Sequence, residues 1–200
     1  MAGRPREFDR DEALIKARNF FWQHGYEGTS MSDLVNALGI ASARIYKAFG
    51  SKEALFREAV IHYETHEGSF ALSALQKKDI RNAIAELLTE AINLYTRDDH
   101  AMGCMVVSSA NALSEENHLL LEWMTQQRIE RGKGIVARFK QAKQEGQLME
   151  NANPELLGQY YSLILHGLSV QARDGATKET LFDIVNFTLS QLDPLIKNNT

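Results

Sequence analysis

The stretch GYEGTSMSDLVNALGIASARIYKAFGSKEALF, residues 25–56, contains two short segments with helical patterning joined by a glycine. Apolar residues recur at three- and four-residue spacing over 30–38 and 41–49, which predicts one amphipathic helix in each. Gly39 separates them and supplies the backbone freedom that a tight turn requires. This arrangement predicts a helix-turn-helix unit.

A capping pattern marks the start of the first of these helices. Ser30 is followed three residues later by Asp33, which is the spacing of a capping box, although Asp is shorter than the usual Glu or Gln. Leu34 and Ile45 are placed to pack against a preceding helix over 10–24. The three helices together form a small unit with its own core.

The second helix of such a unit can enter the major groove of DNA, where its outward residues meet base edges. Arg44 can fork onto a guanine, and Ala43 can contact a thymine methyl. Tyr46 and Lys47 can reach phosphates, and Ser42 shares their face. A three-helix unit that only packs is the alternative, because helix–Gly–helix patterns are common.

The rest of the 200-residue chain is also patterned as helix. It contains three prolines, and it lacks alternating β-branched runs bounded by turn residues, so an all-α fold is predicted. Caps and periodicity predict the remaining helices over 10–24, 52–70, 79–96, 103–113, 115–144, 154–173 and 177–196.

Charge and cysteine content exclude several protein classes. Lys and Arg number 22 against 26 Asp and Glu, and a net charge of −4 argues against non-specific coating of nucleic acid or membrane. A single cysteine excludes a disulfide framework within the chain and fits a reducing compartment. No apolar stretch has the length of a signal peptide core or a membrane span, so a soluble cytoplasmic protein without membrane contact is expected.

The charge is divided unevenly along the chain. Residues 1–66 hold nine basic and nine acidic side chains, and residues 67–200 hold 13 and 17. Arg4 and Arg6 form an acid-free arm that could enter a minor groove, with a solvated tail as the alternative. We therefore expect a helix-turn-helix domain with a basic arm over 1–66 and an all-helical second domain over 67–200.

The segments at 25–34, 38–40 and 45–56 resemble the DNA-binding domain of the TetR (tetracycline-repressor-like) family of bacterial transcription regulators. The resemblance covers about residues 8–60 without a gap. It implies a homodimer with one helix-turn-helix per subunit and a second, ligand-sensing and dimerising domain. It also implies a repressor that a small molecule releases from a palindromic double-stranded DNA operator.

The same resemblance assigns DNA contacts by position. Ser30 and Tyr46 would touch phosphate, Lys47 would lie on or beside the DNA backbone, and Lys52 would clamp another phosphate. Ala41 departs from the family pattern, which often has a Ser there as the cap of the recognition helix. Ser42 is the alternative cap, and using it would shift the base contacts.

The second domain holds a candidate effector site. Gly103 and Cys104 precede a short apolar helix, and a Gly-Cys pair at this place is similar to several TetR-like subfamilies. An apolar cavity with a few polar points is expected, and its alternative is an ordinary core. The effector is unknown, and the predicted lining is Tyr95, Met102, Cys104, Ser108, Trp123, Met124, Tyr161 and His166.

Cys104 has two interpretations. It is either a buried small hydrophobic residue or a thiol that senses electrophiles or oxidants.

The last two helices are apolar over wide faces, and the resemblance implies that they pair with their symmetry mates as a four-helix bundle. The basic residues of 128–143 suggest a second nucleic-acid site or, as we prefer, a solvated helix face.

Catalysis is not expected. Only His62 and His66 have ligand-like i, i+4 spacing, and that pair lacks the Glu of a zinc-protease helix, so neither a metal nor another cofactor is predicted. A DNA-binding protein without ligand control is the remaining alternative, and release from DNA by a small molecule distinguishes the two.

Overall fold

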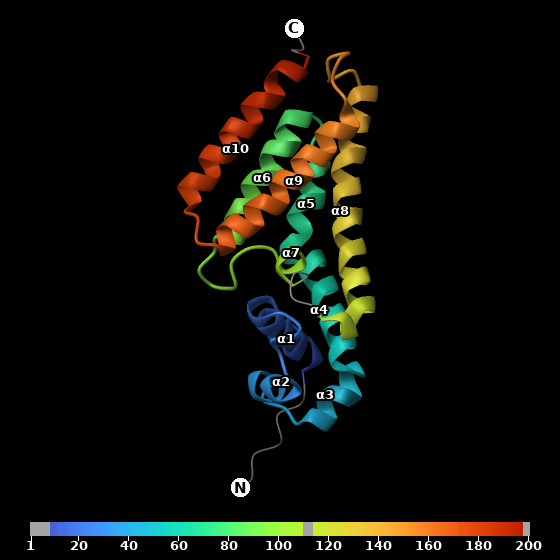
Figure 1. The fold of residues 1–200 in the computed structure, drawn as a ribbon, viewed down its shortest axis with the longest axis vertical. Helices are drawn as coiled ribbons and strands as arrows, with labels where there is room; N and C mark the ends of the chain where they lie inside the picture. The colour runs from blue at the N-terminus through green and yellow to red at the C-terminus, as the bar shows by residue number, and fades with distance from the viewer. Residues whose placement is uncertain (1–8, 110–113, 198–200) are drawn as a thin grey trace.

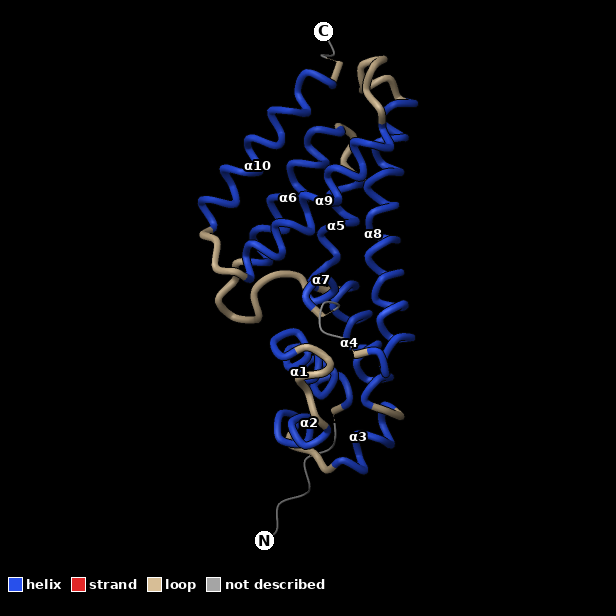
Figure 2. The backbone as a smooth tube through the Cα atoms, in the orientation of Figure 1, coloured by secondary structure: helices blue, strands red, loops and turns tan. Residues whose placement is uncertain are grey.

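The computed structural model describes residues 9–109 and 114–197. Every secondary-structure element longer than a single residue within these ranges is a helix. Figure 2 shows helices joined by loops throughout, which confirms the predicted all-α class. The helices are α1 (Arg10–His24), α2 (Met31–Leu38), α3 (Ser42–Phe49), α4 (Lys52–Thr65), α5 (Phe70–Leu75), α6 (Ile80–Tyr95), α7 (Met105–Ser108), α8 (His118–Gln144), α9 (Pro154–Arg173) and α10 (Lys178–Leu192).

The molecule is elongated, with α1, α2 and α3 at one end and α10 toward the other (Figure 1). α8 runs along one side from the neighbourhood of α4 to the far end. No described helix combines the length and apolarity needed to cross a membrane.

Aromatic side chains pack between α1 and α4. Asp9 caps α1 by accepting hydrogen bonds from the backbone N–H groups of the first turn. Phe21 of α1 and Phe56 of α4 are fully buried, and their ring centroids lie 5.1 Å apart in an edge-to-face arrangement. Trp22 packs against Tyr63 in the same way at 4.8 Å. Burial of these four large rings contributes to the stability of this small unit.

The second part of the chain packs around α6. Its Ile84, Leu87, Leu88 and Ala91 are completely buried. α9 crosses α8 closely because residue 158 is a glycine. A Cβ at Gly158 would come within 2.6 Å of Val136 Cγ2 and 2.9 Å of its backbone N. Only a residue without a Cβ allows this approach.

Several predicted helix bounds are wrong. The helix expected over 52–70 ends at Thr65, and a 3-10 turn at Glu67–Ser69 leads into α5. Gly68 is buried against the backbone of Tyr63, which the turn allows. The chain therefore makes a step between α4 and α5. The amino-acid composition does not predict this break.

Three further helices are shorter than predicted. Gly103 has a φ of +77°, and the helix after it, expected over 103–113, is described as α7 alone. Part of that prediction, residues 110–113, lies outside the described residues. The helix expected over 115–144 begins with a 3-10 turn, so α8 starts at His118. α10 ends at Leu192 and passes into a 3-10 turn at Asp193–Leu195, where Pro194 has no N–H to continue the α-helical hydrogen bonds.

Candidate functional site

The predicted helix-turn-helix is formed by α2, α3 and the turn between them. Ser30 Oγ accepts a hydrogen bond from the backbone N–H of Asp33 at 3.1 Å, and Asp33 Oδ2 accepts one from the backbone N–H of Ser30 at 2.8 Å. The capping box is therefore complete with the shorter acid. Gly39 adopts the left-handed conformation, with a φ of +68°, that ends α2 and turns the chain into α3.

α3 presents the predicted face to solvent. Ile45 and Phe49 are buried against the domain. Ala41 occupies the cap position of α3 without a side-chain hydrogen bond, so Ser42 is the first helical residue and not the cap. The exposed residues of the helix include Ser42, Ala43, Arg44, Tyr46 and Lys47.

Two residues assigned to phosphate are already engaged within the domain. Ser30 Oγ donates to Asp33 Oδ2 at 2.6 Å. Lys52 Nζ donates to the carbonyls of Tyr26 at 3.0 Å and Thr29 at 2.7 Å, and it lies 4.1 Å from the Tyr26 ring centroid. Burial lowers the pKa of Lys52. Two of its three N–H donors thus join α4 to the preceding turn, which differs from its predicted role as a phosphate clamp.

The predicted arm residues Arg4 and Arg6 lie outside the described residues. Among the described residues of α3, Arg44 and Lys47 are the exposed basic side chains.

Several side-chain contacts join the helix-turn-helix unit to the rest of the described chain. Trp22 Nε1 donates to the carbonyl of Gly103 at 3.1 Å. Glu27 Oε1 accepts from the backbone N–H of Ser114 at 2.8 Å and from Asn117 Nδ2 at 2.7 Å. These hydrogen bonds, together with one from the Ser114 hydroxyl, lower the pKa of Glu27. Further along, the guanidinium of Arg57 lies 4.8 Å from the Trp123 ring centroid.

A cavity of about 460 Å³ opens at the step between α4 and α5. α8 forms the opposite wall, and Leu165 of α9 contributes to it. The lining is mostly apolar, with Glu64 and Arg131 among the polar groups. Its size and character suit a small organic molecule.

None of the eight predicted effector residues lines this cavity, and the structure does not gather them around one space. Met102 is 42% exposed, and Trp123 lies beneath Arg57. Tyr161 is core, with its hydroxyl donating to the Thr188 carbonyl at 3.0 Å. Met124 is fully buried, and Ser108 is partly exposed.

Tyr95 and Cys104 instead belong to a buried polar cluster next to the cavity. Arg131 Nη1 donates to Cys104 Sγ at 3.2 Å. Burial raises the pKa of Cys104, but the charge of Arg131 and hydrogen bonds more than offset this, so the pKa lies below the usual value. Tyr63 and Tyr95 also belong to this cluster, and burial is the main cause of the raised pKa of each hydroxyl. Arg131 belongs to both the cluster and the cavity wall.

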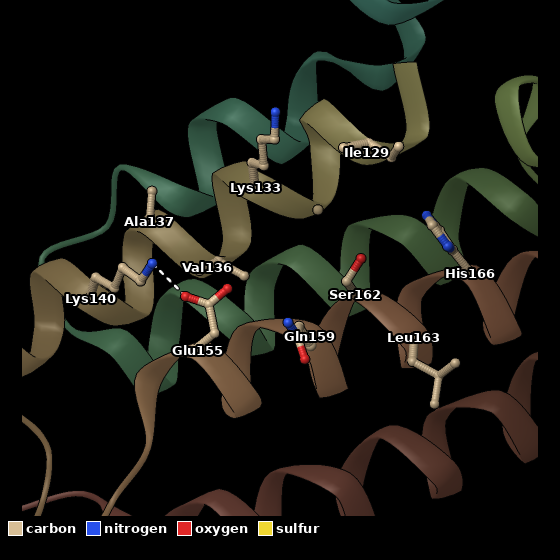
Figure 3. A pocket seen from close by; sticks show the side chains of 11 residues that line it. Ile129, Lys133, Val136, Ala137, Lys140, Glu155, Gln159, Ser162, Leu163 and His166 are labelled. Atoms are coloured by element: carbon tan, nitrogen blue, oxygen red, sulfur yellow. Dashed lines mark ion pairs between the residues drawn. The ribbon is translucent and has the colours of Figure 1, made fainter. Parts of the chain in front are cut away.

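His166 faces a second space, an open groove of about 540 Å³ between α8 and α9 (Figure 3). An ion pair between Lys140 and Glu155 crosses one end of the groove. Ser162 and Leu163 line the α9 side. The groove is therefore amphipathic and continuous with the outer face of α9.

The interpretation of 128–143 as a solvated face is wrong for three of its arginines. Arg138 is 4% exposed and donates to the carbonyls of Lys77 and Lys78 at 3.0 and 2.8 Å. Arg131 points to Cys104, and Arg128 Nη1 is buried. The signal available in the sequence was Gly132, because a glycine inside a helix can indicate a close neighbour, and a Cβ there would lie 3.0 Å from Ser162 Oγ.

The histidine pair does not form a metal site with other ligands in the described part of the chain. The rings of His62 and His66 stack at 3.9 Å, and His62 Nδ1 lies 3.3 Å from Arg18 Nη1. Burial, followed by the charges of His66 and Arg18, lowers the pKa of His62. His62 is partly buried and His66 is exposed.

Comparison with known proteins gives consistent matches along the whole chain. Residues 14–59 match the bacterial regulatory proteins of the tetR family. The chain is 31% identical over 200 residues to the HTH-type transcriptional repressor ComR of Escherichia coli (strain K12), covering 98% of this chain and 94% of ComR. It is 29% identical over 193 residues to the HTH-type transcriptional regulator YezE of Bacillus subtilis (strain 168), covering 96% and 100%.

A solved structure agrees with these matches. A cysteine mutant of the TetR family transcriptional regulator CifR, complexed with 26bp double-strand operator DNA, is 37% identical to this chain. The two structures have a TM-score of 0.88 over 94% of this chain and 98% of CifR.

Proposed function

This chain belongs to the TetR family of bacterial regulatory proteins, and on that basis we propose that it represses transcription as a homodimer bound to operator DNA. Membership makes it a helix-turn-helix transcriptional repressor and not an enzyme, as predicted. The observation that carries the DNA-binding proposal is the exposed face of α3, whose buried side is fixed by Ile45 and Phe49. Such a helix can lie in a major groove without rearranging the domain.

In the proposed complex, α3 divides its exposed residues between bases and phosphates. Arg44 pairs with a guanine, and Ala43 lies against a thymine methyl. Tyr46 and Lys47 reach phosphates on either side, and Ser42 lies at the helix start nearest the DNA. The arm at residues 4–6 adds a minor-groove contact.

Replacing Arg44 by Ala is expected to relax base preference. Loss of a bidentate contact with guanine costs about 1–3 kcal/mol on the operator and little on random DNA. Binding should be measured on both DNAs by fluorescence anisotropy over a range of salt concentrations.

Lys47→Ala is the matched control for a phosphate contact. It should weaken binding to both DNAs alike and reduce the slope of log K against log salt by about one unit. Equal loss on both DNAs for Arg44→Ala would contradict the base contact.

The homodimer is proposed from an exposed apolar surface on the last two helices. Leu156, Tyr160, Leu163 and Val170 recur along one face of α9. Phe187 of α10, which is 67% exposed, continues this surface. A monomer would leave a contiguous apolar surface in water, and a two-fold dimer covers it. Two copies of α3 then match the two halves of a palindromic operator.

Control by a small molecule is proposed from the cavity at the step between α4 and α5. An effector that prefers one arrangement of the two domains shifts the population toward it, typically with about 1–3 kcal/mol of coupling. In this proposal the two domains are 1–66 for DNA binding and 67–200 for sensing and dimerisation. A protein that no compound releases from its operator would support the alternative without ligand control.

The hydrogen bond from Arg131 to Cys104 favours a second mode of control. A cationic donor at 3.2 Å stabilises the thiolate, which is the nucleophilic form. Addition to an alkene electrophile would form a C–S bond at one carbon, while the other carbon takes a proton from water. The preceding residue, Gly103, accepts the hydrogen bond from Trp22 of α1, so added bulk at Cys104 would reach the DNA-binding domain.

Cys104→Ser is expected to abolish release by N-ethylmaleimide while preserving operator binding. Because the chain has one cysteine, any thiol-dependent release must arise there. Gel-shift assays with N-ethylmaleimide and with unreactive N-ethylsuccinimide measure the effect. Equal release of the wild type and Cys104→Ser would exclude a thiol switch.

A further inference from the structure

Arg131 brings a positive charge to the cavity wall without a carboxylate partner. The hydrogen bond from its Nη1 to Cys104 Sγ measures 3.2 Å, and no described carboxylate forms an ion pair with it. A guanidinium keeps its charge throughout the physiological pH range. A guanidinium has five N–H donors, and the one described to Cys104 Sγ leaves others on the cavity side that can bind an anionic ligand.

The cavity lining also holds two acidic residues, Glu64 and Glu130. Burial raises the pKa of Glu64, and the charge of Arg131 opposes the rise. Glu130 is exposed and is paired with Lys133 at 2.7 Å. Arg131 is the one basic side chain of this lining, and the charge of Glu64 would compete with an anionic ligand for it.

Two more cationic or polar groups lie close to Arg131 along the interface of α8 and α9. Arg128 Nη1 is buried and has no hydrogen-bond partner among the described residues. Burial, together with the charges of Arg131 and Arg128, lowers the pKa of His166. The positive charges of the two arginines therefore add at His166, and their combined potential disfavours the protonated form of that histidine.

The remainder of the cavity is apolar. Leu75, Leu87, Ile135 and Leu165 form the inner surface, and Leu72, which is 70% exposed, stands at the opening. The volume of about 460 Å³ exceeds what a small inorganic anion would fill. An occupant that satisfies both regions has an anionic group at one end and an apolar body.

We propose that this cavity binds small organic acids, with a carboxylate paired to Arg131 and an apolar chain or ring against the leucines. The regulatory consequence rests on the proposed function, because the acid then acts as the effector that changes operator affinity. The carboxylate also competes with Cys104 Sγ for the guanidinium. Carboxylate–guanidinium pairing supplies specificity for the acid over alcohols and amines of equal length.

The test uses the full-length protein without DNA and three probes of equal chain length, which are octanoate, 1-octanol and octylamine. Isothermal titration calorimetry gives the Kd of each probe. Octanoate is expected to bind at least about tenfold more tightly than either of the others, the usual effect of one charge-assisted hydrogen-bonded pair. The comparison removes the shared contribution of the apolar chain.

Three variants locate the acid. Arg131→Gln should weaken octanoate binding at least about tenfold and leave 1-octanol unchanged. Glu64→Gln should tighten octanoate binding about threefold or more by removing a competing negative charge, a gain that misfolding cannot produce. Arg173→Gln makes the same chemical change at an exposed position at the end of α9 and should have no effect.

The outcomes separate this proposal from the proposed function. Equal affinities for octanoate and 1-octanol, or an unchanged octanoate Kd in both Arg131→Gln and Glu64→Gln, would overturn the acid site. Operator binding by the probe-free protein is measured separately in gel shifts. Its failure would overturn the proposed function while leaving the calorimetric result intact.

Discussion

Replacing Phe187 by Asp is expected to convert the protein to a monomer and to weaken operator binding by about a hundredfold or more. The side chain is 67% exposed and belongs to the proposed apolar surface of α9 and α10. A carboxylate there would be buried without a partner in the dimer, which opposes association. A monomer holds one half-site only and loses the gain from simultaneous binding of two. Sedimentation velocity and operator titration measure the two effects.

Leu119→Asp is the matched control. Leu119 is 62% exposed and lies in the first turn of α8, away from the apolar surface of α9 and α10. A negative charge near a helix N-terminus is well tolerated, so the protein should remain dimeric and bind its operator. A Phe187→Asp protein that remains dimeric at micromolar concentration would show that association uses another surface.

Replacing Gly158 by Ala is expected to destabilise the protein by about 2 kcal/mol or more. The added Cβ would come within 2.6 Å of Val136 Cγ2 and 2.9 Å of its backbone N. Because backbone atoms form part of the clash, a side-chain rotation cannot relieve it, and α8 and α9 must separate. Denaturant unfolding followed by circular dichroism gives the change in free energy.

Gly134→Ala, on the neighbouring helix α8, is expected to change the free energy of unfolding in the opposite direction. The nearest atom to its added Cβ is Leu75 Cδ1 at 3.8 Å, an ordinary contact. An alanine within a helix is favoured over glycine by about 0.5–1 kcal/mol, so this variant should be more stable than the wild type. If the two substitutions shifted stability equally, close packing of α8 on α9 would not explain the requirement for Gly158.

Local signals predicted the DNA-binding end well. Ser30 with Asp33, Gly39 and the apolar spacing around Ile45 are properties of neighbouring residues, so they determine helix limits and the outward face without tertiary information. The break after Thr65 was missed although Gly68, which disfavours helix, lies in the 3-10 turn that follows it. A single glycine within an otherwise helical pattern is tolerated in many helices, so it did not identify the break by itself.

The cavity was harder to predict. Aromatic and methionine residues such as Tyr161 and Met124 are used by the core, which periodicity cannot distinguish from a ligand site. The sequence predicted a solvated Arg131 because the surrounding helix contains many charged residues. Its contact with Cys104 joins positions 27 residues apart and follows from how α7 and α8 pack. Lys52 likewise turned inward to carbonyls that only the folded turn brings together.

The length of α8 has a mechanical consequence. Its 27 residues form a rod of about 40 Å. Trp123 near one end contacts Arg57, Arg131 stands near the middle, and Lys143 at the other end binds the carbonyls of Met149 and Glu150. A tilt of about 5° around the middle displaces each end by about 2 Å, more than the distance tolerance of a hydrogen bond. A tilt of α8 around Arg131 would therefore carry a change of fit in the cavity to the contact between Trp123 and Arg57.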